Sequence, residues 1–127
     1  MRFLLDTHAV LWYFHEPERL SVVARKAIES SDGIRAISAV SFWEIAIKVS
    51  IGKLTIAEPL SVIQDDFIER GVLLLDIAVR TCISIQELPL HHQDPFDRLL
   101  AAQALGEGFS LISRDSVFDR YGVHRIW

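Results

Sequence analysis

Short apolar runs recur along the chain and alternate with longer segments in which apolar residues return every three or four positions. Short runs bounded by polar residues are typical of buried β-strands, and the longer spacing is typical of helices. The predicted strands cover residues 2–5, 34–38, 72–76, 109–113 and 123–127. The predicted helices cover residues 19–31, 40–52, 60–70, 77–87 and 95–106.

This alternation predicts an α/β fold. Strands that are apolar on both faces belong in a parallel or mostly parallel sheet with helices on both sides, so we expect a three-layer sandwich around about five strands. A chain of 127 residues has the length of one domain, and we expect a single domain over residues 1–127. In such sheets ligands bind beyond the carboxyl ends of the strands, and acids that follow strands are therefore of interest.

Composition narrows the class of protein. Half of the residues are hydrophobic and 24% are charged, which indicates a globular core and not a disordered chain. The one cysteine, Cys82, has no partner for a disulfide or a thiolate metal site, and we interpret it as a small core residue. The N-terminal run MRFLLD reaches an acid too early for a signal peptide, and no run is long enough to span a membrane. We expect a cytoplasmic protein without a membrane partner.

The segment HHQDPFDRLLAAQA, residues 91–104, carries two aspartates at the start of a predicted helix. Asp94 followed by Pro95 is a favourable helix start, because the Asp side chain accepts from free N–H groups and proline has no N–H to leave unpaired. Asp97 falls in the first turn, where the helix dipole favours a carboxylate. Local helix chemistry therefore explains both residues, and only the other acids can show whether Asp97 does more.

Three further acids have unusual positions. Asp6 directly follows a predicted strand and Asp115 follows another, so both should project from the carboxyl edge of the sheet, although each could simply cap a helix. Glu44 lies within an almost wholly apolar helix, where a buried carboxylate without a partner is costly. Lys48, four residues later, offers an ordinary surface ion pair as the alternative.

Together, Asp6, Glu44, Asp97 and Asp115 fit one site. Several carboxylates that lie close together repel one another unless a cation is bound. Ligands that are all oxygen favour a hard ion, Mg²⁺ or Mn²⁺, over zinc. The neighbouring histidines His91 and His92 should point apart, and we interpret them as loop residues, with contact to metal or substrate as the alternative.

Four segments now carry a resemblance: LLDTH at 4–8, SFWEIAIK at 41–48, the segment 91–104, and LISRD at 111–115. In order and spacing they resemble the four acidic motifs of PIN-domain nucleases, and specifically the VapC-like toxins of toxin–antitoxin pairs that carry DPFDR. The resemblance covers essentially the whole chain. It implies that Asp6, Glu44, Asp97 and Asp115 are catalytic, metal-binding acids, oriented by Thr7 and Ser113. Many relatives have Asn or Ser at the position of His8.

The resemblance implies a Mg²⁺- or Mn²⁺-dependent endoribonuclease that leaves a 5′-phosphate and a 3′-hydroxyl. It also implies a small antitoxin as partner, and a homodimer. Asp94, Arg98 and Arg114 adjoin site acids, and the two arginines either contact phosphate or are solvated or ion-paired. Four aromatic side chains either form a groove for the antitoxin or belong to the core: Trp12, Tyr13, Phe42 and Trp43.

The net charge of −4 argues against a general nucleic-acid binder, which usually has a basic surplus. The four acids account for that charge, since −4 minus −4 leaves the remainder neutral. Receiver-type domains need a lysine late in the chain, and the last lysine here is Lys53. Haloacid-dehalogenase-type phosphatases need a second Asp where this chain has His8. The remaining alternative is a catalytically silent module that binds an antitoxin or RNA.

Overall fold

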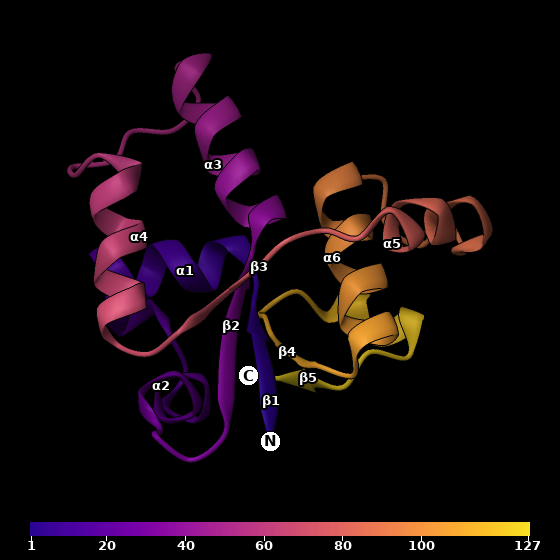
Figure 1. The fold of residues 1–127 in the computed structure, drawn as a ribbon, viewed down its shortest axis with the longest axis horizontal. Coiled ribbons are helices and arrows are strands. Elements are labelled where there is room, and N and C mark those ends of the chain that lie inside the picture. Colours follow the sequence, from indigo (N-terminus) through magenta and orange to yellow (C-terminus); the bar gives the residue numbers. More distant parts are fainter.

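The computed structural model describes residues 1–127, and its centre is a five-stranded sheet in the order β3-β2-β1-β4-β5 (Figure 1). Every pair of neighbouring strands is parallel. The strands are β1 (Arg2–Leu5), β2 (Ile34–Ser38), β3 (Leu73–Leu75), β4 (Ser110–Ile112) and β5 (Arg125–Ile126). All five predicted strands are confirmed, and the sheet is parallel throughout.

Six α-helices and three short 3₁₀ helices connect the strands. They are α1 (Thr7–His15), η1 (Pro17–Arg19), α2 (Val22–Glu29), α3 (Ala39–Ser50), α4 (Leu60–Glu69), α5 (Val79–Ser84), η2 (Ile85–Glu87), α6 (Pro95–Glu107) and η3 (Ser116–Tyr121). Helices α3, α4 and α6 follow their predicted ranges, whereas the helices predicted over 19–31 and 77–87 are shorter and are joined to 3₁₀ turns. The sequence did not predict α1 or η3. No helix combines the length and the apolar character needed to cross a membrane.

The helices cover both faces of the sheet and give three layers (Figure 1). Strand side chains alternate between the two faces: Phe3 and Leu5 pack into one core, and Leu4 between them packs into the other. The first core also contains side chains of α1, α2 and α4, and the second contains side chains of α6 and η3. Both faces of the central strands are therefore buried, as the apolar runs in the sequence predicted.

The four aromatic residues considered for a partner groove divide between core and surface. Trp12, Tyr13 and Phe42 are partly buried and pack against the first core. Trp43 is 54% exposed, and its ring meets the edge of Phe96 at a centroid distance of 4.9 Å. Only Trp43 therefore presents most of an aromatic side chain to solvent.

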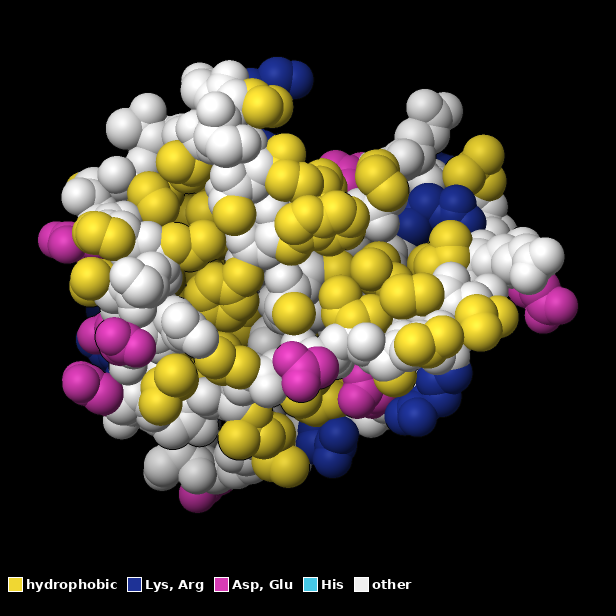
Figure 2. Space-filling model, turned by 45° about the horizontal axis from the view of Figure 1, so that its top comes forward, with side chains coloured by type: hydrophobic (Ala, Val, Ile, Leu, Met, Phe, Trp, Pro, Cys, Tyr) yellow, Lys and Arg dark blue, Asp and Glu magenta, His cyan; other side chains and the backbone are white.

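The prediction that Cys82 is a core residue is wrong, because its side chain is exposed. Helix α5 is amphipathic, but this chain leaves part of its apolar face uncovered, with Val79 74% and Ile83 62% exposed. Trp43 and Leu74 are exposed as well. Figure 2 shows hydrophobic side chains spread widely over one face of the molecule.

Candidate active site

Two of the predicted acids follow adjacent strands of the sheet. Asp6 comes directly after β1, is buried, and accepts from the Ala9 N–H at 2.7 Å. Asp115 comes after β4, the neighbour of β1, and accepts from the Val117 N–H at 3.0 Å. Each aspartate therefore caps a helix with one carboxylate oxygen, and its position at the carboxyl edge of the sheet is set by that cap.

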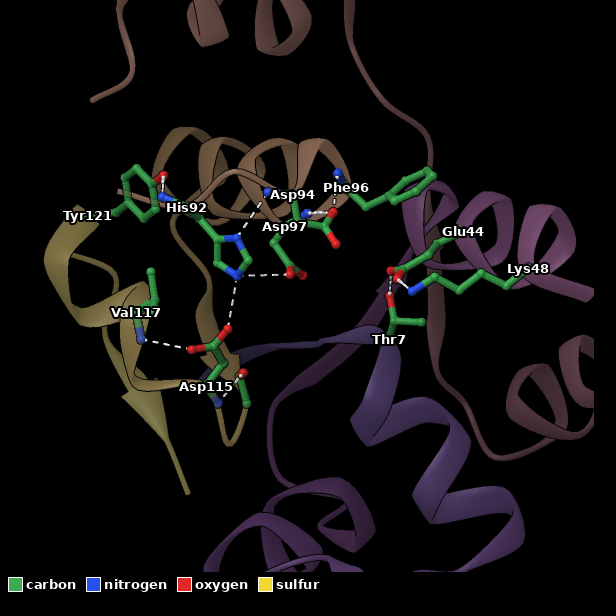
Figure 3. A network of polar contacts seen from close by, with 11 residues as sticks. Thr7, Glu44, Lys48, His92, Asp94, Phe96, Asp97, Asp115, Val117 and Tyr121 are labelled. Atoms are coloured by element: carbon green, nitrogen blue, oxygen red, sulfur yellow. Dashed lines mark hydrogen bonds and ion pairs between the residues drawn. The ribbon is translucent and has the colours of Figure 1, made fainter. Parts of the chain in front are cut away.

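The two aspartates at the start of α6 have different roles. Asp94 is the N-cap, and its Oδ1 accepts from the N–H groups of Phe96 at 2.8 Å and Asp97 at 3.3 Å. The Asp97 carboxylate instead contacts the imidazole of His92, with 3.1 Å between Oδ2 and Nε2 (Figure 3). The capping prediction for Asp94 is confirmed, and Asp97 is left free to serve the site.

Replacing Asp94 with alanine is expected to lower the free energy of unfolding by about 1 kcal/mol, because two N–H groups of α6 lose their acceptor. Serine supplies another capping oxygen and should restore most of that loss. Chemical denaturation of both variants in EDTA measures the difference. Equal stabilities for Asp94→Ala and Asp94→Ser would contradict this account of the helix start.

His92 links two of the acids. Its Nε2 lies 3.0 Å from Oδ2 of Asp115 and 3.1 Å from Oδ2 of Asp97 (Figure 3). The Asp94 N–H donates to Nδ1 at 3.1 Å, so Nδ1 carries no proton and Nε2–H is the donor toward the carboxylates. The backbone N–H of His92 donates to the Tyr121 hydroxyl at 2.7 Å, which fixes the loop.

Both histidines lie in the loop before α6, as interpreted, and His92 faces the acids. The two rings do point apart, since His91 packs edge-on against Tyr121 at 5.0 Å while His92 faces the acids. The only local signal for His92 was its position two residues before the N-cap of α6. Helical or strand periodicity could not reveal it, because the residue lies in a loop.

Glu44 is buried on α3, with both carboxylate oxygens engaged. Thr7 Oγ1 donates to Oε1 at 2.6 Å, and Lys48 Nζ contacts Oε2 (Figure 3). Thr7 also lies 3.1 Å from Ser41 Oγ, which helps to hold its hydroxyl. The ion pair with Lys48, proposed as the ordinary explanation, is present. The Glu44 side chain is only 5% exposed, however, and therefore belongs to the site region and not to the surface.

The acids divide between two adjoining cavities. Asp6, Asp97 and Asp115 line a cavity of about 390 Å³ together with Arg114. Glu44 and Thr7 line a neighbouring cavity of about 350 Å³. The structure thus brings three of the predicted acids into one cavity and places the fourth beside it.

Of the polar residues that the sequence placed next to the acids, Ser113 and Arg114 lie at the acids, whereas Arg98 is bonded to the backbone elsewhere. Ser113 is fully buried, and its Oγ accepts from the Asp115 N–H at 3.0 Å and is hydrogen-bonded to Asp6. Arg98 is partly buried, and its guanidinium donates to the backbone carbonyl of Leu88 at 2.9 Å. Arg98 therefore fastens the segment before α6, and Arg114 is the arginine of the acid cavity.

The acids raise one another's proton affinity. Burial raises the pKa of Asp6, against hydrogen bonds from Ser113 and Ala9 that lower it. Burial and the charge of Asp94 raise the pKa of Asp97 to about 7, and His92 acts in the opposite direction. Glu44 and Asp6 add to the repulsion on Asp97. Burial is the largest cause for both aspartates, and the neighbouring carboxylates add to it.

These side chains fit a divalent cation. Ligand atoms of His92, Asp97 and Asp115 all lie within 4.8 Å of one another, and Asp6 lines the same cavity. Carboxylate oxygens suit Mg²⁺ and Mn²⁺, and the Nε2–H of His92 holds two of these carboxylates together. A bound cation would also relieve the repulsion that raises the pKa of Asp97.

Comparison with known families decides the classification. A family model described as the PIN domain matches residues 3–123, nearly the whole chain. The chain belongs to the PIN domain family. This PIN domain is 34% identical over 114 residues to Ribonuclease VapC22 of Mycobacterium tuberculosis, covering 88% of this chain and 85% of that protein.

Solved structures confirm the PIN fold. The protein is similar to the crystal structure of VapBC2 from Rickettsia felis bound to a promoter DNA fragment, with a TM-score of 0.72, 17% identity and full coverage of both chains. DNA-bound VapBC from Salmonella typhimurium gives a TM-score of 0.65 at 20% identity, covering 98% of this PIN domain and 96% of that chain. These likenesses confirm the three-layer α/β architecture.

Proposed function

We propose that this PIN-domain protein is a metal-dependent endoribonuclease and the toxin of a toxin–antitoxin pair. The observation that carries the proposal is the convergence of Asp6, Asp97 and Asp115 on one cavity at the carboxyl edge of the sheet. The 34% identity to a protein named as a ribonuclease supports RNA as the substrate. The reaction is hydrolysis of a phosphodiester bond, leaving a 5′-phosphate and a 3′-hydroxyl.

Asp6, Asp97 and Asp115 would hold Mg²⁺ or Mn²⁺ in this cavity. A bound divalent ion lowers the pKa of a water molecule and offsets negative charge on a phosphate and its leaving oxygen. His92 holds two of these carboxylates toward one point, through its contacts at 3.0 and 3.1 Å. The buried Ser113 contacts Asp6 and the Asp115 N–H and so helps to fix the positions of both acids.

In this proposal Glu44 is the fourth acid of the active site and lines the adjoining cavity. Thr7 and Lys48 orient its carboxylate and balance its charge, so it is held rigidly beside the other acids. Arg114 lines the acid cavity and is the side chain placed to contact a phosphate group there. Ser113 and Thr7 therefore position acids, as the resemblance implied, while Arg98 has no part in the proposed chemistry.

The test is cleavage of purified total RNA by the purified protein in Mn²⁺, repeated with excess EDTA. Cleavage in Mn²⁺ and none in EDTA is the expected result, with 5′-phosphate termini on the products. Cleavage that continues in EDTA contradicts metal dependence. A protein that binds RNA but leaves it intact in Mn²⁺ would instead be the silent binding module.

The toxin proposal predicts a partner and a phenotype. The structural neighbours are VapBC complexes, which supports a small antitoxin protein as partner here. Induced expression of this chain alone in bacteria is expected to arrest growth, and Asp97→Asn should abolish the arrest at equal protein level. Normal growth with abundant wild-type protein would count against the toxin. The proposed homodimer is measured by light scattering of the purified protein.

A further inference from the structure

The cavity beside the acids is lined by aliphatic side chains, by three cationic side chains and by the rings of Trp12 and two histidines. Its volume is about 350 Å³, and its cationic residues are Arg19, Lys48 and Lys53. It adjoins the acid cavity directly, because His8 and Trp12 line both. The two cavities therefore lie side by side along α1.

The charge of this second cavity is not balanced. Its two carboxylates are already paired, Glu44 with Lys48 and Glu16 with Arg19 at 3.6 Å. The Arg19 pair is about half exposed on both sides and is therefore weak, which leaves the guanidinium available to another anion. Lys53 is exposed and has no carboxylate partner. The cavity consequently offers two cations to an anion: Lys53, which is unpaired, and Arg19, which is only weakly paired.

An aromatic platform lies between the cations and the acids. The His8 ring lies 5.3 Å from the Trp12 ring at an interplanar angle of 31°, and the Arg19 guanidinium lies over Trp12 at 5.3 Å. Trp12 is partly buried and packs against the core, so the exposed ring of this platform is that of His8. Proteins bind single-stranded nucleic acid with cationic side chains along its phosphate backbone and with rings on which its bases stack.

We propose that this cavity binds the single-stranded RNA flanking the scissile phosphate, with Arg19 and Lys53 on its phosphates and the exposed His8 ring, backed by Trp12, against a base. This inference rests on the proposed ribonuclease function and adds the path of the substrate. It also accounts for RNA binding by a chain of net charge −4, because the cations that matter are gathered beside the acids.

The experiment measures fluorescence anisotropy of a labelled single-stranded RNA in EDTA, which stops metal-dependent cleavage. Arg19→Ala and Lys53→Ala should each weaken binding about 5- to 10-fold at low salt, since each loses a charged contact. Each should also reduce the slope of log affinity against log salt by about 0.7. Lys26→Ala, an exposed lysine on α2 outside both cavities, is the matched control and should bind as the wild type does.

His8→Ala separates stacking from charge. It should weaken binding about 5-fold at every salt concentration and leave the salt slope unchanged, because a stacking contact releases no counterions. Wild-type affinity and slope in both Arg19→Ala and Lys53→Ala would overturn the proposal, and the cavity would then be free to hold a protein segment. If the protein binds RNA in EDTA through these residues but does not cleave RNA in Mn²⁺, the RNA-binding proposal stands and only the proposed nuclease activity is refuted.

Discussion

Replacing Asp97 with asparagine is expected to slow RNA cleavage by at least about 100-fold, because even groups that only support a metal ligand typically contribute 10- to 100-fold. The metal-free protein should be as stable as the wild type or slightly more so. Asparagine keeps the shape of the side chain and removes a negative charge that lies among Asp94, Glu44 and Asp6. Helix α6 does not depend on this carboxylate, since Asp94 caps it.

Two measurements check this expectation: the melting temperature in EDTA and the rate of RNA cleavage in Mn²⁺. The control is Asp65→Asn, which removes the same charge from an exposed position on α4 and should change neither quantity appreciably. Near wild-type cleavage by Asp97→Asn would remove this residue from the site. A loss of stability with unchanged cleavage would show that Asp97 serves the helix dipole alone.

The affinity for a divalent ion is expected to rise by about 10-fold per pH unit up to about pH 7 and to level off above it. Burial, with the charge of Asp94, raises the pKa of Asp97 to about 7, so below that pH the ion must displace a proton from this carboxyl group. Calorimetric titration with Mn²⁺ at pH 6, 7 and 8 measures the change. Asp97→Asn should bind the ion weakly at all three values, and an unchanged pH dependence in that variant would assign the proton to another group.

The same raised pKa fixes the direction in which stability changes without metal. In the folded chain the pKa of Asp97 lies above its ordinary value of 3.8. Its contribution to the free energy of unfolding is therefore fully present below that value and is lost as the pH rises through about 7. Excess Mn²⁺ should restore stability at pH 8, because the ion binds the ionised site of the folded chain.

The sequence predicted those features that depend on neighbouring residues along the chain. The apolar runs identified all five strands, since both faces of a parallel sheet are buried. The pair Asp94 and Pro95 identified the start of α6, because capping is a local interaction. Asp6 and Asp115 could be assigned to one edge of the sheet because the parallel topology brings strand ends together.

Other features depend on the fold as a whole and were beyond the sequence. Helix α1 has the sequence THAVLWYFH, which is so apolar that no polar stripe marks its period. The contact between His92 and two acids requires η3 and α6 to meet, and a loop histidine gives no periodic signal. Cys82 was assigned to the core because the segment is amphipathic, but amphipathicity does not show whether this chain itself supplies the cover.

The position of β1 bears on the biosynthesis of the protein. This first strand to be synthesised lies in the middle of the sheet, between β2 and β4, and its last residue, Leu5, pairs with Ile112. On the ribosome β1 can pair early with β2, but its other edge stays open until β4 has been made. Asp97 and Asp115 lie in the same late part of the chain. The proposed active site can therefore assemble only after the segments that carry Asp97 and Asp115 have been made.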